Sequence, residues 1–312
     1  MNTSEPHIAQ HEIVVAAPAL AVFQLLVDVQ QWPRIFPPTV FVDHLGRDGR
    51  SERIRIWATA NGEVKTWVSR RELDPVNLRI DFRQEVSATP IASMGGTWLV
   101  DTLADGRARV RLWHHYEADA PENLAWIEET VDRNSRAELN ALRTHLETTR
   151  PGELTFSFED TVHIDGTARD VFAFLDDADR WPQRLPHVAR ARLDRAPNGV
   201  QSLEMDTRSP HGTTHTTRSY RVAFPHHGIA YKQVTLPPLL SVHTGYWTVA
   251  QHGRRLAVSS RHSVVLDPGN ITSVLGADAS MFEARKYVRE ALSANSLTTL
   301  EHAKRYAEQA GH

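Results

Sequence analysis

The sequence contains no cysteine among its 312 residues. Disulfides, thiolate nucleophiles and cysteine-ligated zinc are therefore excluded, and the composition suits a reducing cytoplasm, which is the compartment we expect. The first residues lack the basic segment and apolar run that mark a signal peptide. No stretch approaches the roughly 18 consecutive apolar residues of a membrane span, so we expect no membrane partner.

Strong charge of one sign is also absent, as are common nucleotide and metal motifs. The formal net charge is -3 with 17 histidines counted as neutral, and there is no lysine- or arginine-rich run. Nucleic acid is therefore not expected as a partner. The sequence has no HExxH, GxSxG, GxGxxG or P-loop motif. We predict a protein that uses no metal and no other cofactor.

What the sequence does contain is an internal repeat. Residues 15–38 align without a gap with residues 164–187, so that Trp32-Pro33 matches Trp181-Pro182. An ordered series of matches at one spacing indicates a duplicated domain. The same spacing of 149 residues returns twice further along, pairing Phe82-Arg83-Gln84 with Tyr231-Lys232-Gln233 and Gly96-Thr97-Trp98 with Gly245-Tyr246-Trp247.

The last part of the repeat is shifted. Asn134-Ser135 matches Asn295-Ser296 at a spacing of 161 residues, so the second copy carries about a dozen extra residues before its last helix. A helix-stopping sequence, Arg150-Pro151-Gly152, separates the copies. We predict two domains, residues 1–150 and 151–312, each close to the roughly 150 residues of a common domain.

Each copy is predicted to be an α+β domain. In the first copy a strand at 11–16 precedes a short helix that begins near Pro18, and a long helix at 122–148 ends the copy. A strongly bent antiparallel sheet that grips such a helix buries both apolar faces and commonly leaves a cavity between them. The alternating runs that would form the rest of the sheet lie at 39–45, 51–59, 64–73, 78–86, 96–103 and 107–117.

Sequence motifs on these strands resemble those of a known family. The resemblance is to the helix-grip aromatase/cyclases of bacterial aromatic polyketide synthesis, in the Bet v 1/START-like superfamily, and the duplicated layout is similar to its two-domain members. It covers nearly the whole chain and implies two tandem helix-grip domains with internal cavities. The motifs, in order after Trp32-Pro33, are Trp67-x-Ser69-x-Arg71, Met94-x-x-x-Trp98 and Leu112-x-His114-x-Tyr116.

The second copy keeps this frame with substitutions. Thr217-x-Ser219-x-Arg221 stands for the first of these motifs if one residue is inserted in the strand. In an ungapped register Arg218 would face inward instead; we prefer Arg221 because it preserves the Ser-x-Arg spacing. A tyrosine is expected shortly after the Trp-Pro element of single-domain relatives. The matching positions here are near Thr39 and Val188, which puts a phenol acid at this place in doubt in both copies.

The residues themselves support an inward-facing arginine. Alternation places Trp67, Ser69 and Arg71 on one face of a strand, and the indole favours a buried face. A buried arginine needs a partner or a wet cavity. Arg71 could therefore have a purely structural role, paired with a carboxylate such as Glu85 or Asp101. His114 could likewise be a hydrogen-bonded residue of the core with no role in function. The presence of both residue types in both copies favours a functional role.

The resemblance implies first-ring formation on a poly-β-ketone, which an acyl carrier protein delivers on its phosphopantetheine arm. The ring closes by an intramolecular aldol reaction, at C7–C12 in the two-domain relatives, and loss of water makes it aromatic without a cofactor. Two alternatives stay open: a non-catalytic carrier of a lipid, sterol or quinone, and a structural chaperone of the synthase. The oligomeric state is not predicted.

The resemblance also implies roles for residues of the first copy. Arg71 would anchor and polarise a ketone or enolate oxygen. His114 would act as base and acid, because the reference pKa of histidine lies near neutral pH. Ser69 and Tyr116 would orient the substrate.

Arg221 and His262 are the corresponding catalytic candidates of the second copy. We hypothesise that the first copy sets the ring position and that the second assists dehydration, because the cavity tryptophan and methionine of the first copy become a threonine and a histidine. The predicted substrate-binding residues of the two copies are Trp32, Phe36, Trp67, Phe82, Gln84, Met94 and Trp98, followed by Trp181, Ser219, Gln233, His243 and Trp247.

Overall fold

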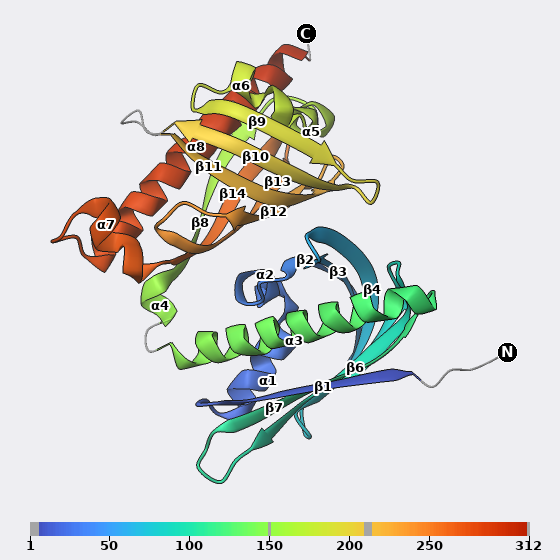
Figure 1. Cartoon of the computed structure of the whole chain (residues 1–312). Coiled ribbons are helices and arrows are strands. Elements are labelled where there is room, and N and C mark those ends of the chain that lie inside the picture. The colour runs from blue at the N-terminus through green and yellow to red at the C-terminus, as the bar shows by residue number, and fades with distance from the viewer. Residues whose placement is uncertain (1–5, 149–150, 209–213, 311–312) are drawn as a thin grey trace. The chain divides into compact units, whose positions relative to one another are not determined.

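A computed structural model of the chain describes residues 6–148, 151–208 and 214–310. The chain divides into two compact units, Met1–Thr149 and Arg150–His312 (Figure 1). Each unit consists of one antiparallel sheet of seven strands with a long helix after the last strand. The predicted α+β class is therefore confirmed in both copies.

The sheet of the first unit grips the long helix α3, which crosses its concave side in Figure 1. Strands that follow one another in sequence are neighbours, and the first strand closes the order by pairing with the last, which gives β1-β7-β6-β5-β4-β3-β2. The elements are β1 (His7–Val15), α1 (Ala19–Val27), η1 (Val29–Gln31), α2 (Trp32–Ile35), β2 (Thr39–Asp48), β3 (Ser51–Ala60), β4 (Glu63–Asp74), β5 (Arg79–Val86), β6 (Ile91–Thr102), β7 (Ala108–Ala118), η2 (Pro121–Asn123) and α3 (Leu124–Glu147).

The second unit repeats this order, with the sheet β8-β14-β13-β12-β11-β10-β9. The expected insertion is confirmed: η4 and α7 separate the last strand from the long helix α8. The elements are α4 (Pro151–Leu154), β8 (Thr155–Ile164), α5 (Ala168–Asp176), η3 (Ala178–Arg180), α6 (Trp181–Arg184), β9 (Val188–Arg195), β10 (Val200–Arg208), β11 (Thr214–Phe224), β12 (Gly228–Thr235), β13 (Leu240–His252), β14 (Arg255–Leu266), η4 (Pro268–Asn270), α7 (Ile271–Leu275) and α8 (Met281–Ala310).

Alternate strand residues and one stripe of each long helix build the cores. In the first unit Ile80 and Leu112 of the sheet pack with Leu26 of α1 and Leu142 of α3, and all four are fully buried. Burial of such a side chain stabilises the fold by about 1.5–3 kcal/mol. The second unit places its own set of apolar residues in the same way: Leu175, Ile229, Val258 and Leu300.

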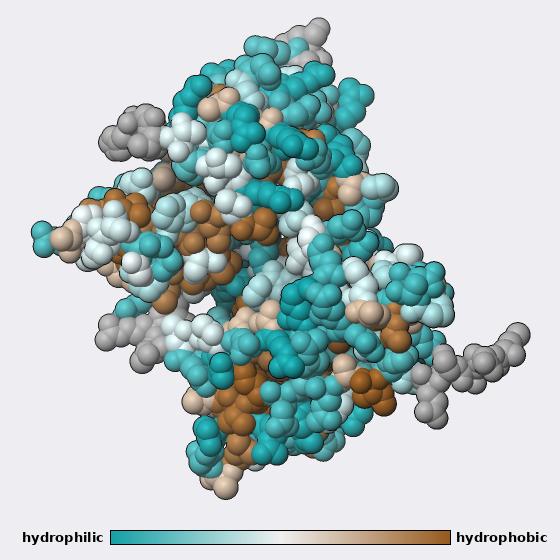
Figure 2. All heavy atoms as spheres, viewed as in Figure 1, coloured by the Kyte–Doolittle hydropathy of each residue, from teal (hydrophilic) through white to brown (hydrophobic). Residues whose placement is uncertain are grey.

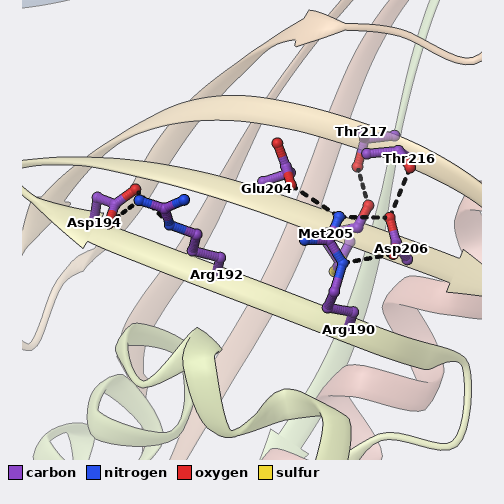
Figure 3. A network of polar contacts seen from close by, with 8 residues as sticks. All are labelled: Arg190, Arg192, Asp194, Glu204, Met205, Asp206, Thr216 and Thr217. Atoms are coloured by element: carbon purple, nitrogen blue, oxygen red, sulfur yellow. Dashed lines mark hydrogen bonds and ion pairs between the residues drawn. The ribbon is translucent and has the colours of Figure 1, made fainter.

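The convex face of the second sheet is polar. Arg190 of β9 donates to Asp206 of β10 at 2.7 Å, and the Thr216 hydroxyl of β11 donates to the same carboxylate at 2.7 Å (Figure 3). Because successive strand residues point to opposite sides, the neighbours Met205 and Thr217 face inward, where they line a cavity. Exposed ion pairs of this kind contribute little stability, but they identify the solvated face.

The insertion of the second unit has an apolar surface. Phe282 is 74% exposed and Val274 is 42% exposed, and Figure 2 shows apolar residues gathered over α7 and the start of α8. Ile271 and Val288 fix the insertion to the sheet through a separate small core. Among the helices of the described residues, none is both long enough and apolar enough to cross a membrane.

Gly96 allows an unusually close approach within the first sheet. A Cβ atom here would lie 2.0 Å from the backbone oxygen of Trp113 and 2.6 Å from the ring of Phe82. Trp113 belongs to the paired strand β7, so its carbonyl cannot move without breaking the ladder. Only glycine fits this position.

We therefore expect Gly96→Ala to lower the free energy of unfolding of the first unit by about 1–3 kcal/mol, because the methyl group overpacks the sheet. Gly46→Ala is the matched control, since no atom lies within 4 Å of a Cβ built there. Urea denaturation of the two variants and the parent chain measures the difference. Equal losses in both variants would show that the close approach is not what matters.

Candidate active site

The first unit encloses an inner chamber of about 100 Å³ between the sheet and α3. Arg71 lies in this chamber, together with the side chains that the motifs predict from the strands β4 to β7. Apart from Tyr116, every predicted site residue of the first copy lines it: Trp32, Phe36, Trp67, Ser69, Arg71, Phe82, Gln84, Met94, Trp98 and His114.

An outer chamber of about 140 Å³ continues from the inner one. The two share Trp67, Met94 and His114 in their walls. The outer lining extends to the half-buried Lys65 and to the exposed Thr89, so this chamber reaches the surface. A chain molecule could therefore enter at that end and place its reacting segment in the inner chamber.

Tyr116 lies outside both chambers, contrary to the orienting role predicted for it. It is buried against Ile127 and Val131 of α3, and its ring stacks on His7 with the centroids 6.0 Å apart. Tyr116 does share a strand face with His114, as alternation predicts. However, two residues along a strand span roughly 6.6 Å, and at that distance α3 already covers the sheet.

Arg71 is clamped on three sides. Its Nη2 donates to the carbonyl oxygen of Leu26 at the end of α1, at 2.6 Å. Its guanidinium carbon lies 5.0 Å from the centre of a Trp32 ring, a cation–π contact. Its Nη1 lies 2.9 Å from a carboxylate oxygen of Glu52, which is itself buried. Arg71 is thus buried and charge-compensated.

The carboxylates suggested as partners of Arg71 are engaged elsewhere. Glu85 pairs with Arg53 at 2.6 Å and Asp101 with Arg111 at 2.6 Å. Both point to the outer face of the sheet. Glu52, the actual partner, lies directly opposite Arg71 in the register of β3 and β4, a pairing that cannot be read from one strand alone.

His114 faces the chambers but is poorly suited to the acid–base role predicted for it. Burial lowers its pKa to about 3, and the nearby His11 and His115 lower it further in the same direction. A histidine with so low a pKa remains neutral at pH 7 and is a weak base. Its ring packs edge-on to Phe82, with 5.6 Å between the centroids. His114 can therefore accept or donate a hydrogen bond as a neutral group.

Glu138 of α3 is a chamber residue that the sequence did not identify. It lines both chambers, opposite His114 and Arg71. Burial raises its pKa to about 7, so its protonated and charged forms coexist near neutral pH. That is the condition under which a carboxyl group exchanges protons efficiently. Its position on the inward stripe of the helix was readable, but its burial in a cavity was not.

The second unit encloses a cavity of about 110 Å³. Arg221 is buried in the cavity wall, whereas Arg218 lies exposed on the other face of β11. The alignment that matches Arg221 with Arg71 is therefore correct. The turn between β11 and β12 is one residue shorter than the turn between β4 and β5, which accounts for the return to the spacing of 149 residues at Gln233. The predicted residues that line the cavity are Trp181, Ser219, Arg221, Gln233, His243, Trp247 and His262.

Two histidines of this cavity are hydrogen-bonded to each other. His243 Nε2 lies 2.9 Å from His262 Nδ1, and His262 Nε2 lies 2.6 Å from the Ser296 hydroxyl of α8. That hydroxyl donates to the Leu292 carbonyl at 2.9 Å. Burial lowers the pKa of both rings, that of His262 to about 4. The neutral tautomers that satisfy these contacts form one chain from His243 through His262 to Ser296.

Tyr231 completes the cluster and was also missed. Its hydroxyl lies 3.1 Å from His262 Nδ1 and 3.4 Å from His243 Nε2. Tyr231 matches Phe82 in the repeat, a pairing that was visible in the sequence but did not reveal a polar contact. No third metal ligand joins the two histidines: in residues 6–148, 151–208 and 214–310 no group of three or more histidine and acidic side chains could hold a metal ion.

The place where single-domain relatives were expected to carry a tyrosine holds other groups. Thr39 is buried in the wall of the outer chamber. In the second unit His187, next to Val188, lines the cavity, and burial lowers its pKa to about 4. Neither copy has a phenol at this position.

Comparison with known proteins identifies the family of this chain. The family described as polyketide cyclase/dehydrase and lipid transport matches residues 6–147 and again residues 155–307. The chain belongs to this family. The two matches fall on the two units, so each cavity lies in a segment that matches the family.

Relatives of this family match nearly the whole chain. The granaticin polyketide synthase bifunctional cyclase/dehydratase of Streptomyces violaceoruber is 48% identical over 97% of this chain and 95% of its own. The actinorhodin polyketide synthase bifunctional cyclase/dehydratase of Streptomyces coelicolor is 42% identical over 97% of this chain and 98% of its own. The chain is therefore an enzyme of the polyketide cyclase/dehydratase class.

A solved structure shares the two-domain organisation. The di-domain ARO/CYC BexL from the BE-7585A biosynthetic pathway is 55% identical to this polyketide cyclase, with a TM-score of 0.88 over 97% of this chain and 99% of that chain. The resemblance to two-domain aromatase/cyclases that the sequence motifs indicated is thereby confirmed.

The low pKa of His262 has a consequence for stability. The folded pKa of about 4 lies below the value near 6.5 of an unfolded histidine. Between these values the unfolded cyclase takes up a proton that the folded one does not, so acidification through this window destabilises the second unit. We expect His262→Gln to flatten the dependence by up to about 1.4 kcal/mol per pH unit. Urea denaturation from about pH 7 to about pH 4.5 measures the slopes, and identical slopes would contradict the shift.

Proposed function

We propose that this enzyme closes the first ring of a poly-β-ketone by an intramolecular aldol reaction and then removes water to make the ring aromatic. The observation that carries the proposal is the inner chamber of the first unit. There the buried cation Arg71 and the carboxyl group of Glu138, with a pKa of about 7, face one apolar space. A fixed cation and a group that moves protons are what an aldol closure requires.

Orientation is the largest contribution that such a chamber can make. Both reacting carbons belong to one chain, so holding that chain in a single folded form converts random encounters into a preorganised reaction. This effect can supply as much as about 7–11 kcal/mol of the barrier. The wall that would impose the fold includes three indole rings, those of Trp32, Trp67 and Trp98. We propose C7–C12 closure as the outcome, in line with the two-domain relatives.

Individual roles follow from the geometry. Arg71 would hold the oxygen of a ketone as it becomes an enolate, since its guanidinium is fixed by Leu26 and Trp32 and needs no reorganisation. Glu138 would take a proton from the acidic methylene between two ketones and return one to the alkoxide. His114 and Ser69 would position the substrate through hydrogen bonds as neutral groups.

The outer chamber supports delivery by an acyl carrier protein. A phosphopantetheine arm is a long flexible tether, and the chain attached to it must reach a buried site while the carrier stays outside. The outer chamber runs from the surface at Thr89 to His114, where the inner chamber begins. We propose that the arm enters there. A simple carrier of lipids would have no need of the buried cation and the titrating carboxyl group at the inner end.

The second cavity would act after the ring has closed. It lacks the large indole of Trp67, whose place Thr217 takes, and it holds the hydrogen-bonded chain of His243, His262 and Ser296. Without the indole, the cavity constrains a flexible chain less. Its hydrogen-bonded side chains can transfer protons to and from a bound substrate. We propose that it assists dehydration of the closed ring.

The role of Arg71 can be separated from its pairing with Glu52. Arg71→Met alone would leave the buried carboxylate of Glu52 with only the exposed His44 as a partner among the described residues, at 3.0 Å. Loss of the buried cation would cost up to about 3–5 kcal/mol and would confuse folding with function. We expect the double variant Arg71→Met/Glu52→Gln to remain folded, because no buried charge is left, yet to lose correct first-ring formation. Product profiles from a reconstituted minimal polyketide synthase measure this. Glu52→Gln alone keeps the cation and should keep the product.

If the double variant gave the parental products, Arg71 would serve only to neutralise Glu52, and the proposed role of the cation would be wrong. Circular dichroism and a thermal melt of each variant establish that the compared proteins are folded.

The division of labour between the cavities is tested by two isosteric changes. Glu138→Gln removes the titrating group of the first unit, and we expect shunt products of misdirected closure. His262→Gln interrupts the chain of the second unit, and we expect correctly closed but incompletely aromatised material. Mass spectrometry of the same reconstituted reaction distinguishes the two outcomes. Identical shunt profiles would mean that the cavities act as one unit.

A further inference from the structure

The two buried arginines, Arg71 and Arg221, make the same two contacts, with a leucine carbonyl and with a tryptophan ring. Arg221 donates from Nη2 to the carbonyl of Leu175, the counterpart of Leu26, at 2.6 Å. Its guanidinium carbon lies 5.6 Å from the centre of a Trp181 ring. Both distances are close to those around Arg71. Differences between the cavities therefore arise from the other residues around each arginine.

The carboxylate that neutralises Arg71 has no equivalent beside Arg221. Glu52 lies opposite Arg71 in the strand register, and Gln201 lies opposite Arg221. The side-chain amide of Gln201 donates to Asp176 at 2.6 Å. Asp176 is the nearest negative charge, and its other oxygen is bound by Arg195 at 2.9 Å.

Arg221 is thus a buried cation without an ion-pair partner. It makes no ion pair with any carboxylate of residues 6–148, 151–208 or 214–310, and its Nη1 has no hydrogen-bond partner. Burial lowers its pKa only to about 10, partly offset by Asp176, so it stays charged at neutral pH. A buried cation that has no ion-pair partner is costly to the fold and is stabilised by any anion that binds against it.

The carboxyl group that lines the first cavity, Glu138, is also replaced in the second copy. Thr299 of α8 stands where the repeat places Glu138 of α3, and its hydroxyl donates to the carbonyl of Asn295 at 2.9 Å. No carboxylate of the described residues lines the second cavity. Around its cation there are instead groups that can donate hydrogen bonds, among them the hydroxyl of Tyr231.

We propose that the second cavity is an anion site, which binds a planar aromatic phenolate, enolate or carboxylate with its charged oxygen on Arg221. The first cavity, whose cation is already paired with Glu52, takes the neutral poly-β-ketone. The identity of the natural ligand rests on the proposed function, because dehydration in this cavity turns the closed ring into an acidic phenol. The presence of the anion site does not depend on that function.

Binding of a simple probe to the full chain tests the site without any synthase. The probe is 3-hydroxy-2-naphthoate, compared by isothermal titration calorimetry with its neutral methyl ester. We expect one mole of the carboxylate to bind per mole of chain, at least about tenfold more tightly than the ester. Equal affinities for the two would overturn the proposal, whatever the product profile in reconstitution.

Two variants assign the binding to Arg221. Asp176→Val/Gln201→Glu installs the residues that the first copy has at these positions, Val27 and Glu52, and should abolish the preference for the carboxylate. Thr217→Trp installs the indole that the first copy carries at position 67 and should block binding of both probes by filling the cavity. Arg218→Gln, which removes an exposed charge on the same strand, is the matched control and should bind as the parent does. Retention of the preference in both cavity variants would also overturn the proposal.

Discussion

A guanidinium group that water does not reach joins the first helix to the sheet in each unit. Arg71 and Arg221 each bind the carbonyl oxygen of a leucine near the end of that helix, beneath a tryptophan ring. The contact closes one end of the helix-grip and places a positive charge at the inner end of the cavity. Because a buried charge must be compensated, the residues around it are constrained more strongly than the rest of the wall.

Burial is the largest influence on the titrating groups of the cavities. The same loss of solvent raises the pKa of Glu138 to about 7 and lowers that of His114 to about 3. It therefore reverses the roles that reference pKa values suggest, since the carboxyl group titrates near neutral pH and the imidazole does not. In the two cavities the buried histidines are neutral at pH 7, and Glu138 is only partly charged. The arginines are the exception, and only one of them has its partner.

Much of the fold could be predicted from the sequence, because alternation and the repeat spacing record which residues face inward. The antiparallel sheet around a long helix and the place of the insertion before α8 follow from these patterns, as do the inner-chamber positions of Trp67, Ser69 and Arg71. Contacts that depend on the exact pairing of strands or on the packing of α3 could not be predicted. Glu52 lies beside Arg71 because the two residues are directly opposite in the register of β3 and β4. The packing of α3 places Glu138 in the cavity wall. The same helix covers Tyr116, which therefore lies outside the cavity.

The pairing of the first strand with the last sets how each copy can assemble. β1 has only β7 as a neighbour in its sheet, and β8 has only β14. The first strand of each copy, β1 or β8, therefore stays unpaired until about a hundred further residues have been synthesised. Contacts of such sequence separation make folding slow and expose an unpaired strand edge meanwhile. Since no strand is shared between the copies, the first sheet can close before the second has left the ribosome, and each copy meets this delay separately.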